Sequence, residues 1–306
     1  MRKILLFALL AAAVIAPWIV GSRYVFHIAT MTAIMIPMAL SMNVMLKIGQ
    51  LSMAQSAFMG VGAYAAALLA MRLGVPSVLA VLAGGIIAAI FALVLGPIFL
   101  RIKGVYFVLL TFAFAQIVNL IFQEWTSLFG GNSGLYGMPK FEIFGMRLTH
   151  VQDYFLLALF VAAFSYALTR LIEASEIGAI FESINENEML ARALGGNALA
   201  WRIAAFAFSA FLAGISGGIY AFYIGFLSPE AFGFGLSVDL IVMNVIGGVS
   251  SALGCVLGAI LVVPLPELLR EAREYQLLIY GVILIVFLMF LKNGLISLFE
   301  SRRRTA

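Results

Sequence analysis

The sequence predicts an all-α polytopic membrane protein with about eight to ten transmembrane helices, some of them short or broken, and one cytoplasmic coupling helix. Of its 306 residues, 64% are hydrophobic and only 10% are charged, and the mean hydropathy is +1.12. Soluble domains carry about 25% charged residues. Since each spanning helix needs about 20 apolar residues, we expect a single transmembrane domain over residues 1–306, interrupted by one long charged segment, residues 173–202.

Apolar runs separated by glycine, proline and charge predict seven spans in the first three quarters of the chain. The start Met1-Arg2-Lys3 followed by apolar residues resembles a signal peptide, but further spans follow at once, so we expect an uncleaved first helix. The predicted spans lie near residues 4–21, 24–46, 57–73, 76–100, 105–123, 153–172 and 201–225.

The C-terminal part predicts a broken helix pair and a last span. Residues 236–265 are too many for one ordinary helix and contain Gly247-Gly248-Val249-Ser250-Ser251, while residues 275–290 form another apolar run. Basic residues mark the cytoplasmic side of a membrane protein. Placing both the N-terminus and residues 302–304 inside requires the chain to turn back near Gly247. Residues 101–103 then lie inside, and the loops 124–152 and 226–235 lie outside.

Two segments look alike. Residues 49–54 leading to Gly60 resemble residues 247–252 leading to Gly258. Transporters often place the solute path where paired, glycine-interrupted helices meet. The alternative is two small polar loops that are similar by chance.

The charged segment predicts a short helix that docks on a protein. Ser183 and Glu186 have capping-box spacing, Glu188 precedes Arg192 in the favourable order for a helical ion pair, and Gly195 follows as a stop. Anionic lipid headgroups would repel the acidic face, so we favour a protein partner over the membrane surface. The residues expected at this contact are Glu182, Ser183, Asn185, Glu186, Asn187, Glu188, Arg192 and Gly195.

The seventh predicted span carries a row of small residues. Ala210, Gly214 and Gly218 repeat at four-residue spacing, with Gly217 beside them. Such rows let helix backbones approach closely within a membrane. The seam lies either within the chain or at a dimer interface.

Ionisable residues are scarce within the spans. His27, Lys47 and Asp239 fall near predicted helix ends and are expected to be interfacial anchors. Uncharged polar residues are therefore the candidates for a wet translocation path, although many such side chains only bridge helices. These candidates are Asn43, Gln50, Ser52, Gln55, Gln116, Asn119, Asn244 and Ser250.

Several signatures are absent from the sequence. It contains no phosphate-binding Gly-x-x-x-x-Gly-Lys-Ser/Thr loop, no His-Glu-x-x-His and no Gly-x-Ser-x-Gly. The lone Cys255 excludes an internal disulfide and a cysteine metal site. We expect no metal site, no ATP hydrolysis by this chain and no enzymatic activity. The net charge of +4 comes from basic residues at span ends, which argues against nucleic-acid binding.

Taken together, several collinear stretches between about residues 38 and 295 resemble the permease subunits of branched-chain amino acid ABC importers, of the LivM type. The similar stretches are Ser41-Met42-Asn43-Val44, Gly49-Gln50-Leu51-Ser52, Ala57-Phe58-Met59-Gly60-Val61-Gly62-Ala63-Tyr64, Arg101-Ile102-Lys103-Gly104-Val105-Tyr106-Phe107, Gly130-Gly131-Asn132-Ser133-Gly134-Leu135, Asn185-Glu186-Asn187-Glu188 with Ala191-Arg192-Ala193-Leu194-Gly195, Gly247-Gly248, Pro266-Glu267-Leu268-Leu269 and Asn293-Gly294-Leu295.

The resemblance implies a multi-pass importer subunit in a bacterial inner membrane, with both termini cytoplasmic. It implies a second, related permease, two cytoplasmic ATPases that bind ATP and Mg²⁺, and a periplasmic solute-binding protein. It also implies that residues 182–195 dock on the ATPases. The sequence departs from the family pattern at Gln55, where a histidine is expected, at Asn185, where arginine is common, and at residues 249–252, which replace a more glycine-rich turn.

The solute that the resemblance favours is a branched-chain amino acid, with urea, short amides and aromatic acids as alternatives. Two other classes of function stay open. An ion-coupled secondary transporter needs a buried carboxylate, for which Asp239 is the candidate. A membrane scaffold without transport needs no path at all.

Overall fold

The computed structural model describes residues 2–143, 145–193, 197–249, 251–269, 275, 278, 279, 281, 282, 285, 289 and 294–298. Its long elements are α1 (Arg2–Val20), α2 (Arg23–Lys47), α3 (Gln55–Leu73), α4 (Ser77–Phe99), α5 (Val105–Glu124), α7 (Val151–Ala174), α8 (Glu176–Ala193), α9 (Ala198–Ile224), α10 (Phe234–Gly247) and α11 (Ala252–Val262). The short ones are α6 (Thr126–Phe129), α12 (Pro264–Leu268), η1 (Gly131–Ser133), η2 (Pro229–Phe232), η4 (Leu295–Leu298), β1 (Leu135–Tyr136), β2 (Glu142–Ile143), β3 (Met146–Arg147) and β4 (Phe226–Leu227).

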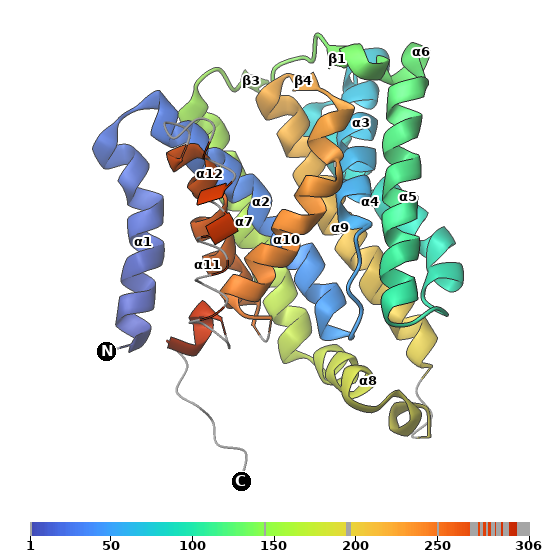
Figure 1. The fold of residues 1–306 in the computed structure, drawn as a ribbon. Helices are drawn as coiled ribbons and strands as arrows, with labels where there is room; N and C mark the ends of the chain where they lie inside the picture. Colours follow the sequence, from blue (N-terminus) through green and yellow to red (C-terminus); the bar gives the residue numbers. More distant parts are fainter. Residues whose placement is uncertain are drawn as a thin grey trace.

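The helices form a bundle with two distinct ends (Figure 1). The short strands and α6 lie at one end, which we call the strand end, and α8 lies across the other, the α8 end. Among the described residues, seven helical segments of 19 to 27 residues are long and apolar enough to cross a membrane. The all-α polytopic fold is therefore confirmed, and six of these segments match the predicted spans near residues 24–46, 57–73, 76–100, 105–123, 153–172 and 201–225. The seventh segment is Pro229–Gly247, whereas the predicted first span, residues 4–21, forms α1, of which Ala11–Val20 counts only as a shorter apolar helix.

The stretch after residue 236 is broken where the glycines predicted a turn. Helix α10 ends at Gly247, and α11 begins at Ala252 after Gly248 adopts a φ of 108°. The two helices then pack through glycine, since a Cβ on Gly258 would overlap the Met243 carbonyl group. The Tyr24 hydroxyl donates to the Glu267 carbonyl oxygen at 3.3 Å, which places α12 beside the start of α2. The predicted turn back is confirmed, whereas most of the predicted span 275–290 lies outside the described residues.

Helix α9 is the centre of the bundle and packs mainly on α4, α3 and α2. Its small residues make this possible: the Cβ position of Gly214 is 2.8 Å from Ala88 Cβ and 2.9 Å from Gly85 Cα, and Gly217 faces the Met59 carbonyl group. Gly218 packs on Val81 in the same way. The small-residue seam therefore lies within this chain. Lipid gives no hydrophobic driving force between helices, so the van der Waals contact of closely packed backbones stabilises this packing instead.

The strand end joins two loops that are distant in sequence. Strands β1 and β4 pair antiparallel, with Leu135 opposite Leu227. Strands β2 and β3 form a hairpin with Glu142 opposite Arg147. Residues 124–152 and 226–235 thus share one end of the bundle, as the predicted topology requires, and α8 lies at the opposite end (Figure 1).

Candidate functional site

Helix α8 begins at Glu176, so the prediction that a helix starts at Ser183 is wrong. Ser175 has extended backbone (φ −91°, ψ 173°), and its hydroxyl accepts a hydrogen bond from the Ile177 amide at 3.3 Å. A serine cap followed by Glu176 in the first turn is a favourable helix start. By Ser183 the backbone amides are already paired, and the Ser183 hydroxyl instead donates to the Ile180 carbonyl oxygen at 2.8 Å.

Helix α8 presents charge on one face and apolar side chains on the other. Phe181 and Ile184 are buried, whereas Glu182 and Glu186 are exposed. The helix bends at Asn187, whose backbone is not helical (φ −153°, ψ 92°). Exposed Ser183 and Asn185 lie on the same stretch. The side chains of Glu188 and Arg192, and all of Gly195, lie outside the described residues, so their predicted pairing and helix stop stay predictions.

One contact joins α8 to the loop between α2 and α3. The Asn185 side chain lies against Gly49, with its Oδ1 where a Cβ would stand and its Cγ 3.3 Å from that position. Gly49 has a φ of 72°, a conformation that favours glycine. Both the backbone geometry and the contact with α8 therefore require glycine here.

Three charged side chains link the C-terminal ends of α2 and α7 beside the start of α8. The Lys47 ammonium contacts Glu173 Oε1, and Arg170 Nη1 donates to Glu173 Oε2 at 2.9 Å. The Lys47 and Glu173 side chains are only 14% and 13% exposed. A desolvated pair of this kind interacts far more strongly than one in water. The predicted anchor Lys47 is thus one half of a half-buried ion pair.

Two of the predicted path residues tie α2 to the break between α10 and α11. Asn43 Nδ2 donates to the Val249 carbonyl oxygen at 2.9 Å, and Asn244 Nδ2 donates to the Ala39 carbonyl oxygen at 3.0 Å. Asn244 Oδ1 also accepts from the Cys255 thiol at 3.0 Å. Both amides are fully buried. They bridge helices, and the broken pair is held to the same helix whose end meets α8.

A second set of buried polar groups surrounds the start of α3. Gln55 Nε2 donates to Ser209 Oγ at 3.3 Å, and Gln55 Oε1 is buried without a partner in the described structure. Ser237 Oγ donates to Ser56 Oγ at 2.8 Å. Gln50 is also buried, and Ser52 Oγ accepts from the Ala54 amide at 3.2 Å. Nearer the strand end, Asn119 Nδ2 donates to the Pro229 carbonyl oxygen at 2.6 Å.

Gln116 differs from the other path candidates because its side chain is exposed. It stands on the outer face of α5 between apolar neighbours, among them Ile117 (58% exposed) and Leu120 (55%). An exposed amide in the middle of a spanning helix is costly against lipid. This face of α5 therefore suits contact with protein or water. Ser250, the last candidate, lies outside the described residues.

Asp239 occupies a different place from the one predicted. It was expected near a helix end, but η2 and Phe234 extend the apolar segment upstream, so the span runs over Pro229–Gly247. Asp239 consequently lies within α10 and is half-buried.

Comparison with known proteins identifies the family. A family model described as the permease component of branched-chain amino acid transport systems matches residues 24–288. The chain belongs to this permease family. It is 30% identical over 321 residues to the high-affinity branched-chain amino acid transport system permease protein LivM of Salmonella typhimurium, and equally so to that of Escherichia coli. Each alignment covers 97% of this chain and 75% of the relative. No solved structure matches significantly.

The family and the fold together make this chain a multi-pass membrane permease, and its relatives are transport proteins rather than enzymes. Sequence reasoning missed three features of the site. The cap at Ser175 was visible as Ser175-Glu176, and Gly49 was visible as a glycine after a basic helix end. The Lys47–Glu173 pair had no local signal, because its partners are far apart in the chain.

Proposed function

We propose that this chain is the permease subunit of an ABC importer that moves branched-chain amino acids from the periplasm to the cytoplasm. It works in a bacterial inner membrane with a second, related permease, two cytoplasmic ATPases and a periplasmic binding protein. The ATPases bind ATP and Mg²⁺, and this chain supplies no cofactor. The names of the relatives, which specify high-affinity branched-chain amino acid transport, support the solute class.

Helix α8 is the observation that carries the proposal. It is a charged helix that lies across one end of an apolar bundle, with Glu182 and Glu186 exposed and Phe181 and Ile184 buried (Figure 1). An acidic face does not suit anionic lipid. A cytoplasmic protein that binds this face can move α8. The α8 end is then the cytoplasmic end, and both termini lie on that side.

The contacts of α8 provide a route for that movement. Asn185 presses on Gly49, and the Gly49 loop leads directly into α3. The Lys47–Glu173 pair keeps the ends of α2 and α7 together. Asn43 and the other bridging amides pass the motion of α2 to the broken α10–α11 pair. Closure of the ATPases therefore tilts a connected group of helices, a change between two packed arrangements.

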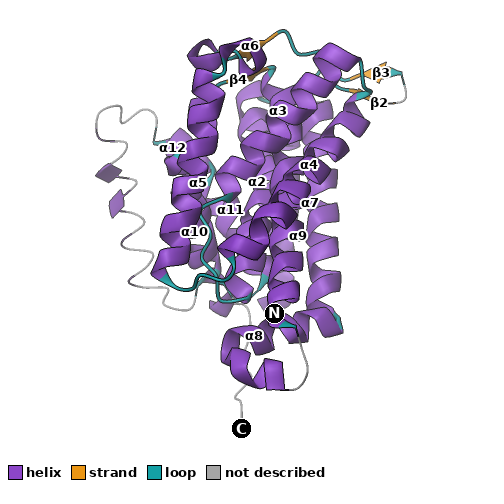
Figure 2. Ribbon diagram, turned by 90° about the vertical axis from the view of Figure 1, so that its right-hand side faces the viewer, coloured by secondary structure: helices purple, strands orange, loops and turns teal. Residues whose placement is uncertain are grey.

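The translocation path runs along the outer face of α5, between this chain and the second permease. Exposed Gln116 on this face and half-buried Asp239 on α10 support that assignment. Helices α5 and α10 stand together on one side of the bundle (Figure 2), and Phe112 of α5 packs on Phe234 at 5.3 Å between ring centroids. The buried amides hold the helices that border the path.

Co-purification with candidate ATPases tests the proposal. We expect the double variant Glu182→Lys with Glu186→Lys to lose at least about ten-fold in ATPase binding, because it reverses the exposed acidic face. Glu124→Lys, an exposed reversal at the end of α5 near the strand end, is the matched control and should bind normally. Equal binding by all three proteins would contradict the docking role of α8.

The solute is tested separately on the binding protein. Leucine, isoleucine and valine should raise its melting temperature, whereas urea, short amides and aromatic acids should not. A shift with one of the latter alone would keep the importer and replace its solute.

A further inference from the structure

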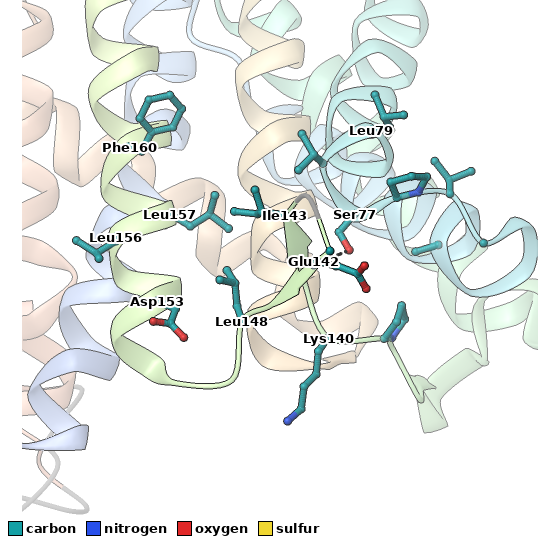
Figure 3. Close-up of a pocket in the computed structure, with 17 residues that line it drawn as sticks. Ser77, Leu79, Lys140, Glu142, Ile143, Leu148, Asp153, Leu156, Leu157 and Phe160 are labelled. Atoms are coloured by element: carbon teal, nitrogen blue, oxygen red, sulfur yellow. Dashed lines mark hydrogen bonds between the residues drawn. The ribbon is translucent and has the colours of Figure 1, made fainter.

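A cavity opens on the side of the bundle near the strand end, away from the candidate functional site. Its volume is about 1150 Å³, and it lies between the start of α4, the β2–β3 hairpin and the start of α7 (Figure 3). This is at or above the upper end of the usual range for small-ligand pockets, roughly 300–1,000 Å³. Helix α4 packs mainly on α9 and α3, and α7 packs mainly on α2, so a groove separates α4 from α7.

The β2–β3 hairpin bridges the two helices at the mouth of this groove. The Glu142 amide donates to Ser77 Oγ at the start of α4 at 3.1 Å, and the Phe141 amide donates to the Tyr154 hydroxyl of α7 at 3.2 Å. Phe141 itself packs on Phe222 of α9, with 5.3 Å between ring centroids. The mouth is thus built by defined contacts and is not a gap between loose loops.

Polarity changes along the groove. Lys140, Glu142 and Asp153 surround the mouth, and apolar side chains such as Leu157 and Phe160 line the groove further along α7 (Figure 3). Phe160 is 68% exposed and stacks on Phe164, which is 54% exposed, so the apolar track continues along α7 toward the α8 end. Within a membrane this track faces acyl chains, and the charged mouth lies at headgroup level.

We propose that this groove binds one phospholipid with a phosphoethanolamine headgroup, with an acyl chain along α7. The Lys140 ammonium matches the phosphate, and the carboxylates of Glu142 and Asp153 match the ammonium of ethanolamine. Asp153 Oδ2 accepts from the His150 amide at 3.1 Å and Glu142 Oε2 accepts from Arg147 Nε at 3.4 Å. A carboxylate accepts through both oxygens, so each keeps capacity for the lipid.

The charges of the mouth select among headgroups. A choline headgroup cannot donate a hydrogen bond to the carboxylates, and a glycerol headgroup brings net negative charge without an ammonium to offset it. The groove also faces away from α5 and α10 (Figure 2), so it meets lipid even when those helices pair with another permease. The site needs only the membrane setting of the chain, and its occupancy is independent of the proposed transport.

Native mass spectrometry of the purified full chain tests the site. Protein from nanodiscs of equal parts phosphatidylethanolamine, phosphatidylcholine and phosphatidylglycerol should retain one phosphatidylethanolamine at least about five-fold above the other two. Leu157→Trp fills the groove and should lose this lipid, whereas Ile90→Trp, an exposed position of α4 outside the groove, should keep it. Glu142→Gln and Lys140→Gln change only exposed mouth groups and should each lower the preference at least about three-fold.

Three results would overturn the site. Equal retention of the three lipids by the wild-type chain excludes headgroup selection. Equal loss in Leu157→Trp and Ile90→Trp excludes the groove as the binding place. A cysteine at Phe160 that a membrane-soluble maleimide labels in the isolated chain, but not in the assembled complex, would assign the groove to a protein partner instead.

Discussion

Gly49→Ala is the perturbation that most directly examines how α8 communicates with the bundle. Alanine at a φ of 72° costs about 1–2 kcal/mol, because a Cβ is disfavoured in the left-handed region. The new methyl group must also displace the Asn185 amide, whose Cγ is 3.3 Å from the Cβ position. Ordinary contact between carbon atoms begins near 3.5–4.0 Å. Asn185 Oδ1 lies closer to the Cβ position than Cγ does, so the amide must move by about 1 Å or adopt another rotamer.

Gly21→Ala is the control that distinguishes the backbone strain from the steric contact with Asn185. Gly21 has a φ of 63°, and nothing lies within 4 Å of its Cβ position. Both variants pay the backbone cost, so their melting temperatures should fall by similar amounts, but only Gly49→Ala disturbs α8. We expect ATP-driven uptake into proteoliposomes to fall about ten-fold or more in Gly49→Ala, equivalent to ~1.4 kcal/mol, and to stay within about two-fold in Gly21→Ala.

Removing the obstructing amide should restore function. In the double variant Gly49→Ala with Asn185→Ala, the Oδ1 and Cγ that obstruct the methyl group are gone, and the residue 185 Cα is 3.7 Å away. Uptake should return to the level of Gly21→Ala. If Gly49→Ala and Gly21→Ala transport equally well, or if the double variant stays as slow as Gly49→Ala, the Asn185 contact does not carry the motion.

Three further predictions concern the Lys47–Glu173 pair, the packing seam and the alternative mechanism. Glu173→Gln leaves the half-buried Lys47 ammonium with less compensation and should lower the free energy of unfolding by about 1–3 kcal/mol in thermal unfolding. Adding Lys47→Met should restore at least about 1 kcal/mol of the lost free energy of unfolding. If the losses of the two single variants simply add in the double variant, the two side chains do not interact. Gly214→Leu should prevent accumulation of folded protein, because its Cβ position meets the backbone of α4, whereas Gly235→Leu, with nothing within 4 Å, should accumulate normally in the same fluorescence-detected chromatography. Asp239→Asn should leave uptake dependent on ATP; uptake by the chain alone that this change abolishes would instead establish ion coupling.

The fold was predictable to a large extent, because spanning helices leave a strong signal in the sequence. Six of the predicted spans and the break at Gly248 follow from apolar length and from glycine punctuation alone. The start of α8 was placed wrongly because two serine caps compete in that segment, and the earlier one, Ser175, pairs the amides first. Local pattern cannot decide between such caps without the contacts that fix the rest of the helix.

The candidate site was less predictable. Polar residue type marked Asn43, Gln55, Asn119 and Asn244 as path residues, but the structure buries them as bridges between helices. An amide that bridges two helices and one that faces a wet path look identical in sequence. The difference lies in which face of the helix meets a neighbour, and only the three-dimensional packing determines that.

The side of the membrane on which α8 lies is the most direct measure of the central claim. Cys255 is fully buried, so a cysteine introduced by Glu186→Cys is the accessible thiol in the described structure. A membrane-impermeant maleimide should label it only from the cytoplasmic side, and bound ATPases should block that labelling. Tyr136→Cys, exposed at the strand end, should be labelled only from the periplasm. Labelling of position 186 from the periplasm would contradict the account, because no cytoplasmic ATPase could then reach α8.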